Sequence, residues 1–246
     1  MRRLAKRVLV ALVGLLPTRL VEKLAVRLLR LKAESLPPDH ALRLLFRVDA
    51  DLYPLQGGLA VQYGGGVHTK HRHTAYHDFF VERVSTGERV LDIGCGNGAL
   101  ARDVAEKAEA KVVGVDFNQA NIDKATRENA HADVRYRCGD ALEELPAEGF
   151  DVVVLSNVLE HLPGRPGFLR RVQDEIKPSR ILIRVPLFER DWRVPLRQEL
   201  GVEWRLDETH ETEYTPESFR AEIAEAGLRI DEMQIRWGEI WAEVRA

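Results

Sequence analysis

One ten-residue stretch, R-V-L-D-I-G-C-G-N-G at residues 89–98, holds the side chains best suited to chemistry. An apolar run that contains Asp92 is followed by glycines at alternate positions and then by a helix-forming stretch from Ala99 to Ala108. Glycine lets the backbone adopt positive φ and approach a ligand closely. A helix beginning just beyond the glycines would add unpaired N–H groups. The stretch therefore predicts a buried strand that turns into a helix at a ligand site.

The glycine spacing distinguishes two classes of ligand. A dinucleotide site needs G-x-G-x-x-G, with the pyrophosphate at the helix N-terminus. This turn reads G-x-G-x-G and has Ala99 where the third glycine would stand. Asp92, two residues before the first glycine, would repel a pyrophosphate and attract an amine. The turn favours a ligand with a cationic amine, and NAD or another nucleotide is the alternative.

Further polar residues follow later apolar runs. Asp116 ends K-V-V-G-V-D, and an acid at that place can accept hydrogen bonds from ribose hydroxyls. Phe117 could flank an adenine, and Asp140 could accept from its amino group. The run F-D-V-V-V-L is followed by S-N-V-L-E-H at 156–161. Because ligands of open α/β sheets bind at the carboxyl ends of strands, we expect these residues to meet at one edge.

The elements that position these residues alternate between strand and helix from Arg89 to Val244. Their order resembles class I S-adenosylmethionine (SAM) methyltransferases. D-I-G-C-G-N-G is similar to motif I of that family, and G-D-A at 139–141 agrees in order and spacing. S-N-V-L-E-H is similar to the fourth-strand motif of small-molecule methyltransferases, including polyprenyl-phenol O-methyltransferases. The resemblance implies an α/β, Rossmann-like, seven-stranded and mostly parallel sheet with an antiparallel last strand and helices on both faces.

The resemblance also implies SAM as the cofactor and a role for each matching residue. Asp92 and the backbone at the glycine turn would hold the methionine end, and the ribose and adenine would follow along the sheet edge. Arg72, or Lys70 beside it, could pair with the cofactor carboxylate. The expected cofactor-binding residues are Asp92, Gly94, Cys95, Gly96, Asp116, Phe117, Asp140, Ala141, Ser156, Asn157 and Arg72.

A phenol or alcohol acceptor must lose a proton when it is methylated. His161 is the first candidate base, and His71 and His77 are further candidates because the pKa of histidine lies near neutrality. His73 and His77 are spaced by one helical turn, which suits a metal. Since Lys70 and Arg72 would repel a cation there, we expect no metal site.

The N-terminal segment differs from the rest in charge. Residues 1–33 carry nine Lys and Arg against one Glu, a net +8 that leaves −11 for the remainder of a chain whose total is −3. Its leucines and basic residues have helical spacing on opposite sides, broken at Pro17. Such helices bind anionic membrane surfaces, pack on protein, or act as a signal or anchor. We favour the membrane surface, with a cytoplasmic protein held peripherally at the inner membrane face.

Three segments follow from these patterns: a basic amphipathic helical extension at 1–33, a helical cap at 34–84, and the SAM-binding domain at 85–246. An insertion at 186–214 within that domain is expected to shape the acceptor side. The sequence predicts a SAM-dependent methyltransferase that acts, at oxygen, on a small-molecule or lipid-linked acceptor. A non-catalytic SAM-binding or membrane scaffold is the alternative. Because the core has no basic face with interleaved aromatic residues, we expect no nucleic-acid partner.

Overall fold

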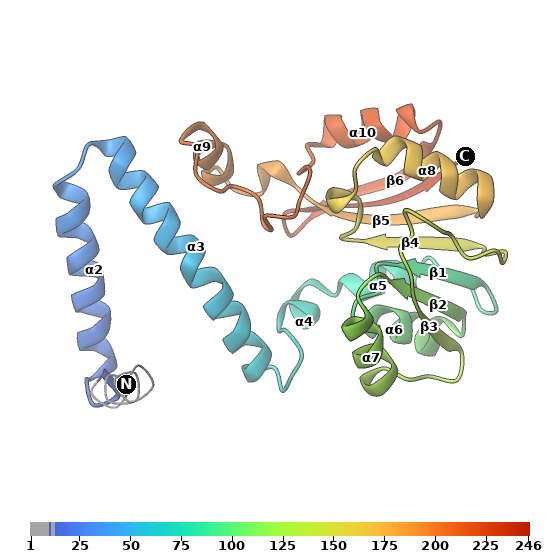
Figure 1. Cartoon of the computed structure of the whole chain (residues 1–246), viewed down its shortest axis with the longest axis horizontal. Coiled ribbons are helices and arrows are strands. Elements are labelled where there is room, and N and C mark those ends of the chain that lie inside the picture. Colours follow the sequence, from blue (N-terminus) through green and yellow to red (C-terminus); the bar gives the residue numbers. More distant parts are fainter. Residues whose placement is uncertain (1–9, 11–12) are drawn as a thin grey trace. The chain divides into compact units, whose positions relative to one another are not determined.

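The computed structural model describes Val10 and residues 13–246 of the chain (Figure 1). These residues divide into two compact units. The smaller unit comprises the chain up to Leu59 together with Arg197–Glu203. The larger unit comprises Ala60–Leu196 and Trp204–Ala246, and it contains every strand of the described chain.

Two helices form most of the smaller unit, which confirms an α-helical N-terminal extension. Helix α2 spans Thr18–Glu34 and α3 spans Pro38–Tyr63, continuing through Pro54. Among the described residues, α2 buries no side chain and α3 buries only Phe46. The helix predicted before Pro17 lies largely outside the described residues.

The larger unit alternates strands and helices as the sequence predicts. Its strands are β1 (Arg89–Ile93), β2 (Lys111–Asp116), β3 (Val134–Cys138), β4 (Val152–Ser156), β5 (Arg180–Pro186), β6 (Arg229–Arg236) and β7 (Glu239–Arg245). Its helices are α4 (Lys70–Thr74), α5 (Tyr76–Val81), α6 (Ala99–Ala108), α7 (Gln119–Glu128), α8 (Arg165–Glu175) and α10 (Pro216–Glu225), with short 3₁₀ turns η1 (Leu159–His161) and η2 (Phe188–Arg190). Helix α9 (Arg193–Glu199) crosses the boundary between the two units.

The strands form one seven-stranded sheet in the order β3-β2-β1-β4-β5-β7-β6. All pairs from β3 to β5 are parallel, and β7 runs antiparallel to both β5 and β6. This confirms the predicted mostly parallel sheet with an antiparallel last strand. The carboxyl ends of β1, β2 and β4 therefore lie at one edge of the sheet, and Asp92, Asp116 and Ser156 lie at that edge.

Side chains alternate between two apolar layers, one on each face of the sheet. On one face Leu91, Val153 and Ile183 pack with apolar residues of α8 and α10. On the other, Val90, Val154 and Leu182 pack with residues of α5 and α6. The predicted helices on both faces are thereby confirmed. A sheet buried on both sides explains the near-continuous apolar runs in its central strands.

Candidate functional site

The glycine turn joins β1 to α6 with all three glycines in the left-handed region, at φ 71°, 55° and 77°. A Cβ on Gly98 would collide with the ring of Tyr136, so this position needs glycine for packing as well as for φ. A Cβ on Gly96 would meet no heavy atom within 4 Å. Open space therefore borders the backbone at Gly96, as the approach of a ligand requires.

Asp92 is the most unusual charged residue of this edge. It is 3% exposed, and its Oδ2 has no hydrogen-bond partner among the described residues. Burial, reinforced by the negative charge of Asp116, raises the pKa of Asp92 to about 7. A buried carboxylate without a partner is costly, so this oxygen is suited to a cationic donor from a ligand.

Asp116, at the end of β2, is also buried but is well supplied with donors. Its Oδ2 accepts from the backbone N–H of Gly96 at 2.9 Å. Its Oδ1 accepts from the backbone N–H of Asn118 at 2.8 Å and from Asn121 Nδ2 at 3.1 Å. A carboxylate has about four acceptor positions, so roughly one remains for a ribose hydroxyl. The predicted contact with both hydroxyls would require one of these bonds to be shared or released.

The residues predicted to face the adenine lie farther out along this edge. Phe117 is 78% exposed, which leaves its ring open to a planar ligand. Asp140 is exposed, and its Oδ1 accepts from the backbone N–H of Leu142 at 2.8 Å. Ala141 is half-buried against the core beside α8. The local role of Asp140 is thus to shape the turn after β3, and its contact with adenine stays a prediction.

Ser156 and Asn157 close the edge at the end of β4. Asn157 has a left-handed φ of 58°, a conformation that Asn adopts more readily than most residues with a side chain. Its backbone N–H donates to the Arg184 carbonyl at 2.8 Å. The Ser156 hydroxyl accepts from Arg184 Nη1 at 3.2 Å. Two of the predicted cofactor-binding residues, Ser156 and Asn157, are therefore held by β5.

The other two candidate bases, His71 and His77, lie on the segment before β1. Ala75, at φ 50°, breaks the helix between α4 and α5, so His73 and His77 do not share one helical face. His77 Nδ1 lies 2.8 Å from Asp103 Oδ2 on α6. Burial, followed by the charge of His77, lowers the pKa of His71 to about 4.

Arg72 lies on the exposed side of the same segment. Its guanidinium carbon is 5.6 Å from the centre of the Tyr63 ring. Burial and the positive charge of Arg184 lower the pKa of neighbouring Lys70. Of the two cations considered for the cofactor carboxylate, Lys70 is therefore the one whose pKa is affected by Arg184 at the sheet edge. The contact of Arg72 with the cofactor stays a prediction.

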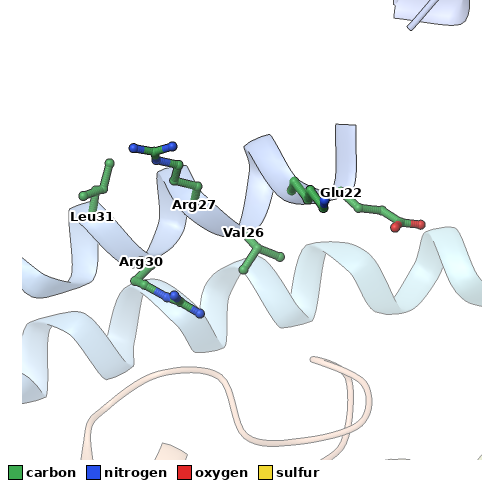
Figure 2. A pocket seen from close by; sticks show the side chains of 6 residues that line it. Glu22, Val26, Arg27, Arg30 and Leu31 are labelled. Atoms are coloured by element: carbon green, nitrogen blue, oxygen red, sulfur yellow. The ribbon is translucent and has the colours of Figure 1, made fainter. Parts of the chain in front are cut away.

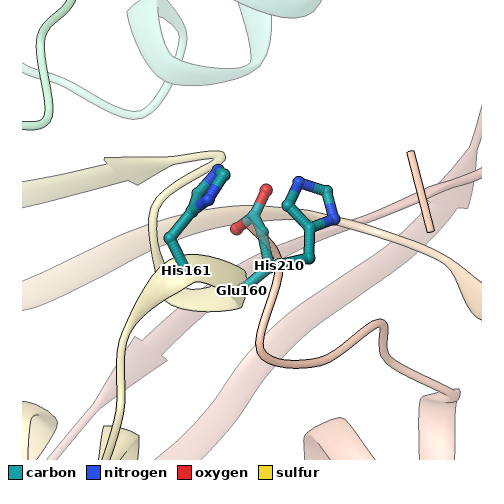
Figure 3. Close-up of side chains that lie close together, drawn as sticks. All are labelled: Glu160, His161 and His210. Atoms are coloured by element: carbon teal, nitrogen blue, oxygen red, sulfur yellow. The ribbon is translucent and has the colours of Figure 1, made fainter. Parts of the chain in front are cut away.

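His161 lies in a second cluster, with Glu160 and His210 (Figure 3). The rings of His161 and His210 meet edge to face with centres 4.5 Å apart. Glu160 is completely buried, and neither carboxylate oxygen has a hydrogen-bond partner among the described residues. Burial is the main cause that raises the pKa of Glu160 to about 7. The insertion reaches this cluster because the backbone N–H of Glu211 donates to the Glu160 carbonyl at 2.7 Å.

Hydrogen bonds assign the proton on His161. The Thr209 hydroxyl donates to Asp207 Oδ1 at 2.7 Å and lies 2.9 Å from His161 Nδ1. A hydroxyl has only one proton, so Nδ1–H of His161 must donate to Thr209. The lone pair of a neutral His161 is then on Nε2, where it can accept a proton or bind a metal.

The same cluster could hold a divalent cation. One ligand atom from each of Glu160, His161 and His210 lies within 4.8 Å of the others. His210 Nδ1 is 3.3 Å from Glu213 Oε1, and such a contact orients a metal-binding histidine. The sequence did not lead us to expect this arrangement, because His210 is 49 positions after His161 and its loop has no periodic pattern.

Comparison with known proteins identifies the family to which this chain belongs. A family profile described as "Methyltransferase domain" matches residues 68–233, two thirds of the chain. The chain belongs to the methyltransferase domain family. This membership confirms the resemblance to class I SAM-dependent methyltransferases, and SAM is the cofactor.

Individual relatives agree with this assignment. A ubiquinone biosynthesis O-methyltransferase of Rhodopseudomonas palustris is 32% identical over 60% of this chain and 60% of its own length. Another protein of that name, from Azorhizobium caulinodans, is 36% identical over 64% and 65%. The chain thus spans less than two thirds of either relative. Magnesium protoporphyrin IX methyltransferase from Synechocystis, solved with bound S-adenosylhomocysteine, shares the fold with a TM-score of 0.55 at 17% identity, over 70% of this chain and 83% of that one.

The site of the methyltransferase domain fits SAM on its own geometry. The unpartnered Oδ2 of Asp92 suits the amine of the cofactor. The open space beside Gly96 lets the cofactor approach the backbone of the glycine turn. Asp116 retains acceptor capacity for the ribose. The individual contacts were assigned by resemblance, and they stay predictions.

The structure adds residues that sequence reasoning missed. Arg184 belongs to the site edge, and Thr209 orients the first candidate base. For Arg184 a signal existed, because a charge interrupts the otherwise apolar run R-I-L-I-R-V-P. Thr209 has no comparable signal, since its role depends on a contact across 48 positions.

Proposed function

We propose that this protein transfers a methyl group from SAM to an oxygen of a small-molecule or lipid-linked acceptor. The observation that carries the proposal is the buried Asp92 Oδ2, which has no hydrogen-bond partner among the described residues and precedes a turn that is open at Gly96. When bound, SAM supplies an electrophilic methyl group on a sulfonium. The names of the ubiquinone biosynthesis O-methyltransferases support oxygen as the methylated atom.

His161 is the residue we assign to removing the acceptor proton. Thr209 and Asp207 fix its ring so that Nε2 has the lone pair. Glu160 is buried beside it, and above about pH 7, where its carboxyl group is ionised, its negative charge favours the histidinium that forms. Deprotonation makes the acceptor oxygen a stronger nucleophile, and positioning supplies most of the remaining rate enhancement.

The acceptor side is lined by the insertion at 186–214. Phe188 and Trp204 meet edge to face with ring centres 5.3 Å apart, and Arg190 ties this pair by donating to the Trp204 carbonyl at 2.9 Å. His210 and Tyr214 are buried farther along the same segment. Aromatic rings beside a titratable cluster suit a phenolic acceptor.

We also propose that α2 binds an anionic membrane surface, with the protein at the cytoplasmic face. Leu20, Leu24, Leu28 and Leu31 of α2 are between 42% and 70% exposed and lie at helical spacing on one side. Lys23 and Arg27 border them, and Figure 2 shows Arg27 and Leu31 projecting from the same side of the helix. Exposed leucines with a basic border are typical of interfacial helices. In the described residues, no helix is both long and apolar enough to cross a bilayer.

Transfer of a labelled methyl group tests the reaction. Catechols with and without a polyprenyl tail should accept label from SAM, whereas matched anilines and thiols should not. Preference for the tailed catechol would support a lipid-linked acceptor. Label on nitrogen or sulfur only would contradict O-methylation.

Sedimentation with vesicles tests the membrane surface. Replacing Leu24 and Leu28 of α2 with serine should reduce sedimentation with phosphatidylglycerol vesicles, and phosphatidylcholine vesicles should bind weakly. Ile235→Ser, at an exposed apolar position of β6, is the matched control and should sediment as the unaltered chain does. Equal sedimentation of all three proteins would show that α2 does not bind the membrane.

A further inference from the structure

One buried cation, Arg184, joins three elements at the carboxyl edge of the sheet. It lies on β5, and its side chain is 5% exposed. Its Nε and Nη2 each donate to a different carboxylate oxygen of Glu239 on β7, both at 2.7 Å. Its Nη1 donates to Ser156 Oγ on β4 at 3.2 Å. The guanidinium is therefore fixed in one orientation by planar, two-point pairing.

The flat face of this guanidinium contacts the segment that precedes β1. The Arg184 guanidinium carbon lies 3.9 Å from the centre of the Tyr76 ring on α5, a close cation–π contact. Tyr76 is 9% exposed, and its ring in turn packs edge to face against His77, with centres 4.4 Å apart. The Tyr76 ring thus attaches the segment Lys70–Val81 at the sheet edge, while Phe79 and Phe80 of the same segment are buried in the core.

Tyr76 lies at the same edge of the sheet as Asp92, because Arg184 contacts both the Tyr76 ring and Ser156 of β4, the strand that pairs with β1. Burial raises the pKa of Tyr76 to about 12, and the negative charge of Asp92 contributes in the same direction. Both residues are buried, so the Asp92 carboxylate is shielded from water there. Shielding strengthens a charge interaction because the local dielectric constant falls.

Stability alone does not account for the buried ion pair of Arg184 and Glu239. Burying an ion pair costs desolvation energy that its attraction often fails to recover, and an apolar pair of similar volume is commonly as stable. The pair is placed where the orientation of a ring matters, between Ser156 and Tyr76. Orientation of the site accounts for its presence better than stability does.

We propose that Arg184, held by Glu239, is a positioning residue that fixes Tyr76 and the segment Lys70–Val81 over the methionine end of the cofactor site. The proposal rests on the proposed function. In this account the Tyr76 ring lines the cofactor site. Glu239 of β7 contributes by fixing the Arg184 side chain that holds the ring.

A double-mutant cycle on cofactor affinity tests the proposal in the full chain. Arg184→Lys keeps the charge but loses the planar two-point pairing, and Tyr76→Leu removes the stacked ring. Each should weaken binding of S-adenosylhomocysteine by about tenfold, and the double variant should be little worse than either alone because both remove one contact. Arg180→Lys is the matched control, since Arg180 lies at the other end of β5 and pairs with Glu88.

The rate of trypsin cleavage after Lys70 and Arg72 distinguishes local release of this segment from a general loss of stability. Both variants should be cut there faster than the Arg180→Lys control at equal fractions of folded protein, and S-adenosylhomocysteine should protect them less. Glu239→Gln gives the same test if Arg184→Lys does not fold. Additive losses in the cycle, or affinity within twofold of the unaltered chain, would overturn the positioning role. Failure of the unaltered chain to bind S-adenosylhomocysteine would instead overturn the proposed function.

Discussion

The carboxylate of Asp116 accepts a 2.9 Å hydrogen bond from the backbone N–H of Gly96, so the end of the second strand fixes the glycine turn that follows the first. The same carboxylate accepts from Asn118 and Asn121 at the start of α7. One side chain therefore shapes two of the loops at the cofactor edge. Its loss should affect both the ligand and the fold.

Asp116→Ala should weaken binding of S-adenosylhomocysteine by about 1–3 kcal/mol and lower the free energy of unfolding by a similar amount, because buried donors lose their acceptor. Calorimetry and thermal unfolding measure the two effects. Asp123→Ala, at an exposed position on α7, is the control and should change neither. Unchanged affinity in Asp116→Ala would refute the ribose assignment.

Two glycines of the turn should respond differently to alanine. Gly96→Ala meets open space and strains only φ, so it should cost about 1–2 kcal/mol of stability while strongly reducing cofactor affinity. Gly98→Ala drives a methyl group into the Tyr136 ring, and we expect the larger loss of stability there. Unfolding curves and calorimetry of both variants separate these outcomes. Unchanged cofactor affinity in Gly96→Ala would mean that the ligand does not approach at Gly96.

The raised pKa of Asp92 predicts a pH-dependent cofactor affinity. With a pKa of about 7 in the free protein, Asp92 is protonated at lower pH and must lose that proton to pair with an amine. Affinity for S-adenosylhomocysteine should fall by up to about tenfold per pH unit below 7, with release of a proton on binding. Calorimetry in buffers of different ionisation enthalpy measures that proton. Asp92→Asn should bind weakly at every pH, and a variant that kept the dependence would show that another group causes it.

Burial of Asp92 also has a consequence for stability without ligand. Its pKa is higher in the folded chain than the ordinary 3.8, so between about pH 4 and 7 the folded state binds more protons than the unfolded one. The contribution of this group to stability is therefore largest at low pH and is lost as the pH rises toward 7. Asp92→Asn should flatten that part of the stability profile in denaturant unfolding. A profile that is the same in both proteins would contradict the shift.

Thr209→Val should reduce kcat by about tenfold to a hundredfold, since it removes the group that orients a functional histidine. Affinity for S-adenosylhomocysteine should not change, because Thr209 contacts the acceptor side only. Thr212→Val, in the same loop, is the matched control. Equal activity in the two variants would remove His161 from the role of base, or show that its ring is oriented by other groups.

The sequence predicted best those features that depend on local pattern. Three apolar runs, one containing Asp92 and two ending in Asp116 and Ser156, marked strands buried on both faces. A shared edge followed because the carboxyl ends of parallel strands lie at the same edge of a sheet. Arg184 was recognisable only as a charge in an apolar run. Its partner Glu239 lies 55 positions away on the one antiparallel strand, and no periodicity connects the two. The contacts of the insertion were likewise hidden, because loops have no repeating pattern.

Binding of S-adenosylhomocysteine to the full chain by calorimetry is the most direct test of the central claim that Asp92 and the glycine turn form a SAM site. We expect one site per chain with an affinity in the micromolar range (Kd about 1–100 μM, roughly 5.5–8.2 kcal/mol), no measurable heat with NAD, and a loss of heat in Asp92→Asn. Binding of NAD in place of S-adenosylhomocysteine, or binding that Asp92→Asn leaves intact, would contradict it.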